Sequence, residues 1–148
     1  MRFIFAAAAA VLAVLPAQAF AQDWYRAGGN ANNMSYVDLA SVKPIGGKIL
    51  AVTKSVYREQ LSGDTGIYST QIRAEYDCAG NYFRTLEYSY FDISNKLMST
   101  EPSQSINEHK VPAKGSINEA MMDFICYRKG GTQVTDPFTD AKIEMSKM

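Results

Sequence analysis

The stretch IYSTQIRAEYDC, residues 67–78, decides the fold. Its side chains alternate between two faces, which is the period of two typical of a half-buried β-strand. One face carries Tyr68, Thr70, Ile72, Ala74, Tyr76 and Cys78, whereas the other carries Ser69, Gln71, Arg73, Glu75 and Asp77. The mainly apolar face is the one expected to be buried, so the alternation places Cys78 against the core.

The residues around this stretch predict an antiparallel sheet. The sequence AGN at 79–81 is a turn signal, and the aromatic run at 82–91 after it completes a β-hairpin. In that run we expect Tyr82, Leu86, Tyr88 and Tyr90 on one face, opposite Phe83 and Phe91. Shorter strand patterns between turn residues lie at 23–26, 35–38, 48–58 and 96–100. The sheet is therefore expected to have about five to six strands.

A helix follows the strands. Ser116 and Glu119 form a capping box, in which each side chain satisfies a free backbone N–H of the first turn. An apolar stripe at helical spacing comes next, formed by Ile117, Ala120, Met121, Phe124 and Ile125. Gly130 is the expected stop. Cys126 lies beside the stripe, so it is able to point at the sheet.

The first 21 residues have the pattern of a secretion signal. Arg2 precedes an apolar run at 3–15, and small residues at 17, 19 and 21 offer cleavage sites. The run is shorter than the roughly 20 residues that span a bilayer, so no membrane span is expected. We predict a signal peptide at 1–21 and export to the periplasm, the extracellular space or the cell surface.

Cys78 and Cys126 are the only two cysteines. An even number in an exported chain predicts a disulfide, because oxidising compartments preserve such bonds. Closing a loop across 48 positions restricts the unfolded chain by about 4 kcal/mol in the entropic model. The predicted fold is α+β, an antiparallel sheet with a C-terminal helix disulfide-linked to it.

The size of the chain suits one domain, predicted at 22–130, followed by a tail at 131–148. Within the tail, Asp136 and Pro137 are a helix-start pair that predicts a short helix. The 15 basic and 15 acidic side chains balance and are scattered singly. This balance argues against a nucleic-acid partner and against a polybasic membrane contact.

No motif predicts catalysis, a cofactor or a metal. Asp64 begins the tripeptide DTG of aspartic proteases, but it stands in a Gly- and Ser-rich turn instead of after an apolar strand. His109, the only histidine, stands in a polar crossing and is expected to be a solvated loop residue. No His, Cys and carboxylate cluster has ligand spacing. We therefore predict a protein that is not an enzyme.

The tyrosines leave two interpretations open. Tyr68, Tyr76, Tyr82, Tyr88 and Tyr90 all belong to the predicted hairpin. The main expectation is that most of them line the core beneath the helix. The alternative is a partly exposed face for binding or dimerisation, because aromatic side chains anchor protein interfaces.

Several short motifs follow one another along the chain in an order typical of one protein family. They are Trp24-Tyr25-Arg26, Tyr36-Val37-Asp38, Arg73-Ala74-Glu75-Tyr76-Asp77-Cys78, Tyr82-Phe83-Arg84 and Phe124-Ile125-Cys126. Together they resemble the surface-adhesin protein E family of small exported bacterial domains, over about residues 23–126. The resemblance implies a sheet and helix joined by Cys78–Cys126, a non-enzymatic module that binds host extracellular proteins, and a fold that dimerises. The alternative is a periplasmic structural or accessory envelope protein that acts through self-association.

Overall fold

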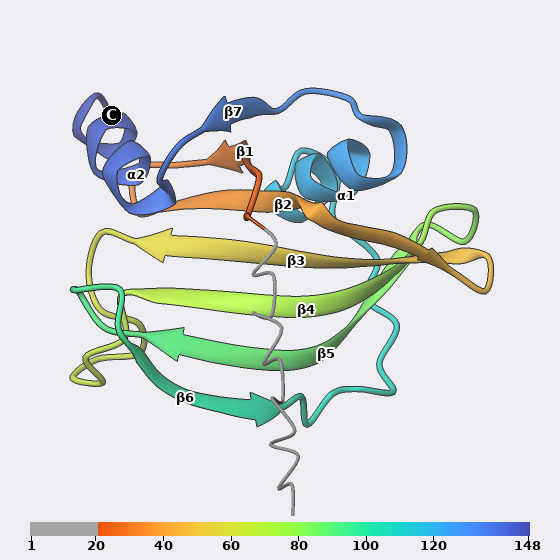
Figure 1. Ribbon diagram of the computed structural model, residues 1–148, viewed down its shortest axis with the longest axis horizontal. Helices are drawn as coiled ribbons and strands as arrows, with labels where there is room; N and C mark the ends of the chain where they lie inside the picture. The colour runs from red at the N-terminus through yellow and green to blue at the C-terminus, as the bar shows by residue number, and fades with distance from the viewer. Residues whose placement is uncertain (1–20) are drawn as a thin grey trace, which may run out of the picture.

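The structure, a computed structural model, describes residues 21–148. Residues 1–20 lie outside the described part, and with them all but the last residue of the predicted signal peptide. A seven-stranded antiparallel sheet has the order β6-β5-β4-β3-β2-β1-β7 (Figure 1). Its strands are β1 (Trp24–Gly29), β2 (Asn33–Ile45), β3 (Lys48–Tyr57), β4 (Ser69–Asp77), β5 (Tyr82–Phe91), β6 (Leu97–Pro102) and β7 (Thr132–Val134). The helices are α1 (Ile117–Tyr127) and α2 (Pro137–Ser146).

The α+β class, the antiparallel sheet and the disulfide-linked helix are confirmed. The sheet has one strand more than the upper end of the expected range. The additional strand, β7, has three residues and pairs with the outer edge of β1, where Trp24 faces Val134. Three residues are too few to display a period of two. Their pairing depends on a free sheet edge that lies more than a hundred residues earlier in the chain.

A β-bulge changes the facing of the tyrosines in β5. Arg73 pairs with Glu87, but the next residue of β4, Ala74, pairs with Thr85, so Leu86 is the extra residue. An extra residue reverses the alternation beyond it. The expected face of Tyr82 with Leu86, Tyr88 and Tyr90 is therefore wrong. The residues that share a face across the bulge are Phe83, Thr85, Tyr88 and Tyr90.

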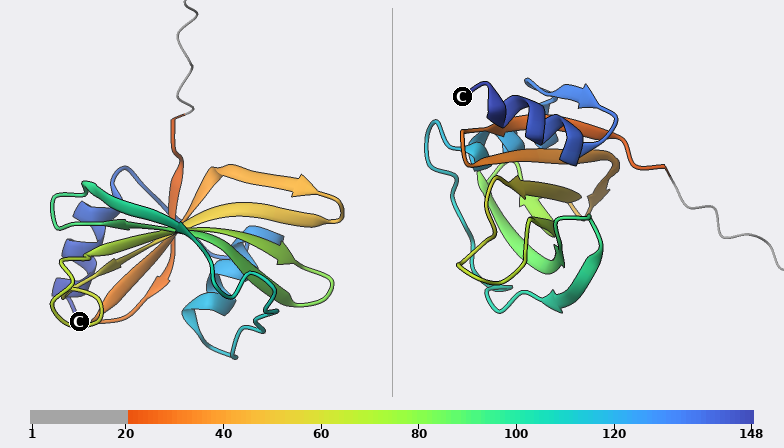
Figure 2. Two further views of the ribbon diagram at one scale, coloured as in Figure 1. Left: turned by 90° about the horizontal axis from the view of Figure 1, so that it is seen from below. Right: turned by 90° about the vertical axis from the view of Figure 1, so that its left-hand side faces the viewer.

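The two helices pack on opposite faces of the sheet and build two separate cores. Helix α1 buries Met121, Phe124 and Ile125 against a face that includes Ala74 and Tyr76. The core beneath α2 lies on the other face and consists of Trp24, Met34, Tyr36, Val56, Ala141 and Met145. Figure 2 shows the two helices at opposite ends of the twisted strands. This arrangement covers mainly β1–β3, and in Figure 1 neither helix of the described chain lies over β5 or β6.

Helix α1 begins at the predicted Ser116 cap, but the Glu119 carboxylate accepts from the residue before the cap instead of from the cap itself. Glu119 donates its backbone N–H to Ser116 Oγ at 3.1 Å, while its own carboxylate accepts the N–H of Gly115 at 2.6 Å. The helix ends before the expected stop at Gly130, because Arg128 takes a left-handed conformation with φ 54°. The Arg128 side chain donates to the carbonyls of Phe124 and Ile125, which offsets the cost of that conformation.

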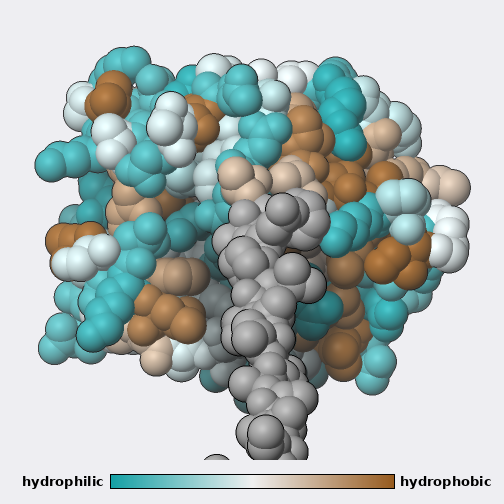
Figure 3. Space-filling view, viewed as in Figure 1, coloured by the Kyte–Doolittle hydropathy of each residue, from teal (hydrophilic) through white to brown (hydrophobic). Residues whose placement is uncertain are grey.

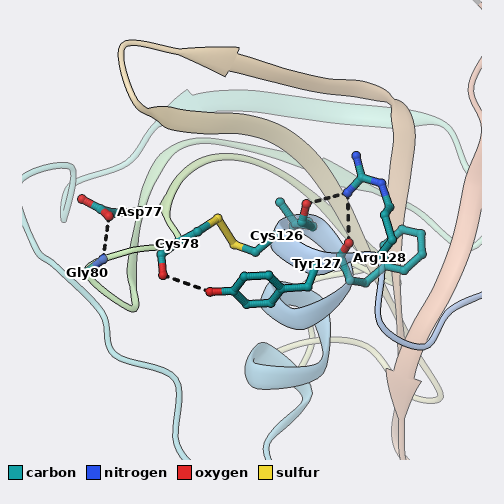
Figure 4. Close-up of a disulfide and its surroundings, with 8 residues drawn as sticks. Asp77, Cys78, Gly80, Cys126, Tyr127 and Arg128 are labelled. Carbon is teal, nitrogen blue, oxygen red and sulfur yellow. Dashed lines mark hydrogen bonds between the residues drawn. A yellow bond between two sulfur atoms is a disulfide. The ribbon is translucent and has the colours of Figure 1, made fainter.

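The disulfide joins the end of β4 to the last turn of α1 (Figure 4). The Cα atoms of Cys78 and Cys126 are 5.7 Å apart. Beside the bond, the Tyr127 hydroxyl donates to the Cys78 carbonyl at 3.2 Å. Asp77 accepts the N–H of Gly80 at 2.7 Å and fixes the turn that follows β4. The position of α1 on the sheet is thus held by a covalent bond and by hydrogen bonds on either side of it.

Polar groups hold α2 to the opposite face. Asp136 caps the helix by accepting the Thr139 N–H at 2.9 Å. Asp140 accepts from Arg26 Nη1 at 2.7 Å and from the fully buried Tyr36 hydroxyl at 2.8 Å. Burial, followed by the hydrogen bond to Asp140, raises the pKa of Tyr36 well above its ordinary value, so this hydroxyl remains a donor. No helix among the described residues is long and apolar enough to cross a membrane.

Candidate functional site

The residues considered for catalysis do not come together. Asp64 stands in the exposed loop between β3 and β4, where its carboxylate accepts a long hydrogen bond of 3.4 Å from Gln60. His109 is exposed, and its ring stacks on Tyr82 with centroids 4.1 Å apart. Within residues 21–148 there is no group of three or more His, Cys, Asp or Glu residues that would hold a metal ion.

The stacked His109–Tyr82 pair belongs to a cluster of charged residues on the α2 side of the sheet. Lys48 Nζ lies 5.5 Å from the centre of the Tyr82 ring and 3.5 Å from Glu75. Glu75 also accepts from Arg84 at 2.9 Å, and this hydrogen bond lowers the pKa of its carboxyl group. Glu75 pairs with both cations and His109 stacks on Tyr82, so the cluster fastens the polar crossing to the hairpin.

A surface with aromatic character lies on the α1 side of the sheet, beyond the end of α1. We call it the tyrosine face and define it as Tyr57, Thr70, Tyr88 and Tyr90. Tyr90 pairs with Thr70, and Tyr88 pairs with Ile72, on the same face as the buried Ala74. The three tyrosines are half-buried and have no helix above them.

The phenol groups of the tyrosine face are close to one another. The Tyr88 and Tyr90 rings are nearly parallel, with an angle of 3° and centroids 6.2 Å apart. Tyr57 donates to Thr70 Oγ1 at 3.3 Å, and Tyr90 donates to Glu101 at 3.0 Å. Burial raises the pKa of Tyr57, and burial together with the Glu101 hydrogen bond raises the pKa of Tyr90 to about 12. Tyr57 and Tyr90 therefore each offer an apolar ring with a neutral hydroxyl at its tip.

The tyrosine face continues to a free sheet edge. All six residues of β6 are exposed, and Leu97 and Met98 are 53% and 49% exposed. Strand β6 pairs with β5 alone and is the last strand of the described sheet on that side. An edge strand has backbone N–H and C=O groups that are able to pair with another chain. Aromatic anchors and an unpaired edge are features of a surface that binds protein.

A comparison with protein families identifies one family model that matches the chain. The family model described as surface-adhesin protein E matches residues 24–127. The chain belongs to the surface-adhesin protein E family. No curated protein and no solved structure matches it. The matched region runs from the first residue of β1 to the last residue of α1, so it contains both cysteines and the tyrosine face, while β7 and α2 follow it.

Membership of the surface-adhesin protein E family agrees with the disulfide and with the aromatic surface described above. The family describes surface proteins that adhere, which suggests a non-enzymatic role and a protein partner. The disulfide fits an exported or surface protein, because such bonds persist in oxidising compartments. In the view of Figure 3, hydrophilic residues spread over most of the surface and brown, hydrophobic residues gather in its right half.

The main expectation, that most of the five hairpin tyrosines line the core beneath α1, is wrong, and the alternative of a partly exposed face agrees better with their burial. Only Tyr76 is buried, at 3% exposure, whereas Tyr68, Tyr82, Tyr88 and Tyr90 are half-buried. The expectation that most of them pack beneath α1 fails because α1 is too short to reach the far end of β4 and β5. Leu86, Tyr88 and Tyr90 alternate regularly along the sequence, so no local pattern marks the bulge that assigns Tyr88 and Tyr90 to the α1 side.

Proposed function

We propose that this protein is an exported, non-enzymatic binding module that attaches to an extracellular protein of a host. The observation that carries the proposal is the tyrosine face beside a free edge strand, in a chain of the surface-adhesin protein E family. Tyrosine provides a large rigid contact area with a polar tip, and few rotatable bonds need to be fixed on binding. A signal peptide at 1–21 would deliver the domain to the compartment in which such a partner occurs.

The edge strand adds a backbone component to this binding. An extended segment of the partner would pair with β6 and extend the sheet, while its side chains contact the tyrosine face. Leu97 and Met98 supply apolar contacts at the same edge. Pairing of the backbone with β6 contributes affinity, and contacts with the tyrosine face contribute specificity for the partner.

Binding of the purified exported protein to solubilised basement-membrane matrix tests the proposal. Replacing Tyr88 and Tyr90 together with alanine removes the half-buried parallel ring pair, and we expect the affinity to fall at least tenfold. The matched control is Tyr127→Ala, because Tyr127 is 65% exposed and lies outside the tyrosine face. Unchanged binding by the folded double variant, or an equal loss in the control, would contradict the assignment of this surface.

A second candidate follows from the same edge strand. Two copies that pair through β6 would form a continuous sheet across a homodimer, in a periplasmic structural or accessory protein. Sedimentation of the wild type and of Met98→Lys separates the two candidates, since a lysine at an edge blocks strand pairing. Dissociation of a wild-type dimer by this substitution, together with confinement of the protein to the periplasm, would support self-association and exclude the host-adhesin role.

A further inference from the structure

A groove that shares Tyr57 with the tyrosine face lies where α2 meets the end of β3, the β3–β4 loop and the β5–β6 turn. Its volume is about 470 Å³, which is within the range of small-ligand sites. Apolar and aromatic side chains form most of the lining, namely Val56, Tyr57, Tyr68, Ile93, Phe138 and Met145. Ile93 is 68% exposed at the mouth, while Val56 and Met145 are buried at the floor. The right-hand view of Figure 2 faces this end of the molecule.

The charged residues of the groove all have the same sign. Arg58 and Lys142 belong to the lining, and none of the lining residues in the described chain is an acid. Neither side chain forms an ion pair with a carboxylate of residues 21–148. Two unpaired cations beside an apolar lining are complementary to an anionic group attached to an apolar chain.

The guanidinium of Arg58 is already held in place. Its Nε donates to the Ala31 carbonyl at 2.5 Å, and its Nη2 donates to the Met145 carbonyl near the end of α2. An arginine has five N–H donors, so three remain free for a ligand. A guanidinium fixed by backbone carbonyls loses little side-chain entropy when it binds a carboxylate.

A third cation, Lys54, lies behind the lining, beside the rings of Phe91 and Phe138. Lys54 is 5% exposed, and its Nζ lies 4.2 Å from the centre of the Phe91 ring and 5.2 Å from that of Phe138. Nζ donates one hydrogen bond, to Asn95 at 2.9 Å. Asp136 partly offsets this charge from the start of α2. The charged residues of the lining itself are therefore the two cations Arg58 and Lys142, in a groove that is mainly apolar.

We propose that this groove binds a small amphipathic anion, with an apolar chain against Val56, Phe138 and Met145 and a carboxylate at Arg58 and Lys142. An apolar chain alone would leave the cations without a partner. A cationic amphiphile would meet like charges. The site depends on α2, which follows the region that the family model matches, and it shares only Tyr57 with the tyrosine face, so its tests use residues outside that face.

Titration of the exported protein with dodecanoate, below the concentration at which it forms micelles, tests the inference. Calorimetry gives the affinity, and the methyl signals of Met145 in NMR spectra report where the chain binds. Dodecyltrimethylammonium is the matched probe of opposite charge. We expect saturable binding of dodecanoate, shifts at Met145, and at least tenfold weaker binding of the cationic probe.

Two substitutions at exposed positions test the lining without disturbing a core. Ile93→Asp places an acid at the mouth and should weaken dodecanoate binding at least tenfold, and Lys142→Glu should weaken it about as much. Lys114→Glu is the control, because Lys114 is exposed in the polar crossing away from the groove. Absence of saturable binding, equal binding of both probes, or equal affinity of Ile93→Asp and the wild type would overturn the inference.

Discussion

Lys54 makes the stability of this protein depend on pH in a direction opposite to that of a paired lysine. Burial lowers the pKa of Lys54 to about 8, from an ordinary value of 10.5, and Asp136 offsets only part of that effect. A lysine with a lowered pKa prefers to be neutral in the folded state. Between pH 8 and pH 10.5 the unfolded chain therefore binds more protons than the folded chain, and the free energy of unfolding rises with pH.

The size of this effect follows from the two pKa values. At pH 7 the buried charge costs about 3 kcal/mol relative to pH values above 10.5, and about 2 kcal/mol of this is recovered between pH 7 and pH 9.5. Lys54→Met removes the charge and retains an unbranched chain beside Phe91 and Phe138. The hydrogen bond to Asn95 is lost, but Asn95 is exposed, so its side-chain amide forms a hydrogen bond with water instead. We expect the variant to be more stable than the wild type at pH 7 by about 1–2 kcal/mol, after the loss of cation–π contacts.

Urea unfolding at pH 7, 8, 9 and 9.5 measures both quantities. Trp24 is the only tryptophan, is 5% exposed and belongs to the core beneath α2, so its fluorescence reports the relevant unfolding. The wild type should gain about 2 kcal/mol across this range, whereas Lys54→Met should show little of this rise. Parallel pH profiles of the two proteins would refute the reasoning.

The disulfide, the α2 cap and the Tyr36 hydroxyl each give a further expectation for stability. Cys126→Ser should lower the free energy of unfolding by about 4 kcal/mol, less any strain released. The intact mass of the wild type should rise by two hydrogens on reduction. A free thiol in the native protein would contradict the bond. Asp136→Ala should cost about 1 kcal/mol through loss of the helix cap, measured by urea unfolding, and a neutral result would mean that α2 does not depend on it. Tyr36→Phe leaves the Asp140 carboxylate short of one buried donor and should cost about 1–2 kcal/mol in the same assay, and an unchanged midpoint would show that this hydrogen bond contributes nothing.

Local signals in the sequence were sufficient for the parts of the fold that local chemistry determines. The alternation at 67–78 placed Cys78 on the side of the sheet that carries α1, where it bonds to Cys126, and the capping box at Ser116 indicated the start of α1. The left-handed Arg128 was not predictable from residue preference, because its stabilisation comes from its own side chain returning to two carbonyls.

Features that depend on distant pairing were beyond local patterns. Strand β7 exists because β1 offers a free edge, and no periodicity is visible in three residues. The bulge at Leu86 assigns Tyr88 and Tyr90 to the α1 side, and the length of α1 leaves them uncovered. The candidate binding surface therefore depends on the bulge in β5 and on where α1 ends, and both are properties of the folded chain.

The central claim is that the protein binds its partner through the tyrosine face and the β6 edge. Amide hydrogen exchange with and without bound basement-membrane matrix measures this directly, because exchange slows where a partner covers or pairs with the backbone. We predict added protection in β5 and β6, with α1 unchanged. Protection confined to α1 or α2, or no change in β6 at saturating matrix, would contradict the claim.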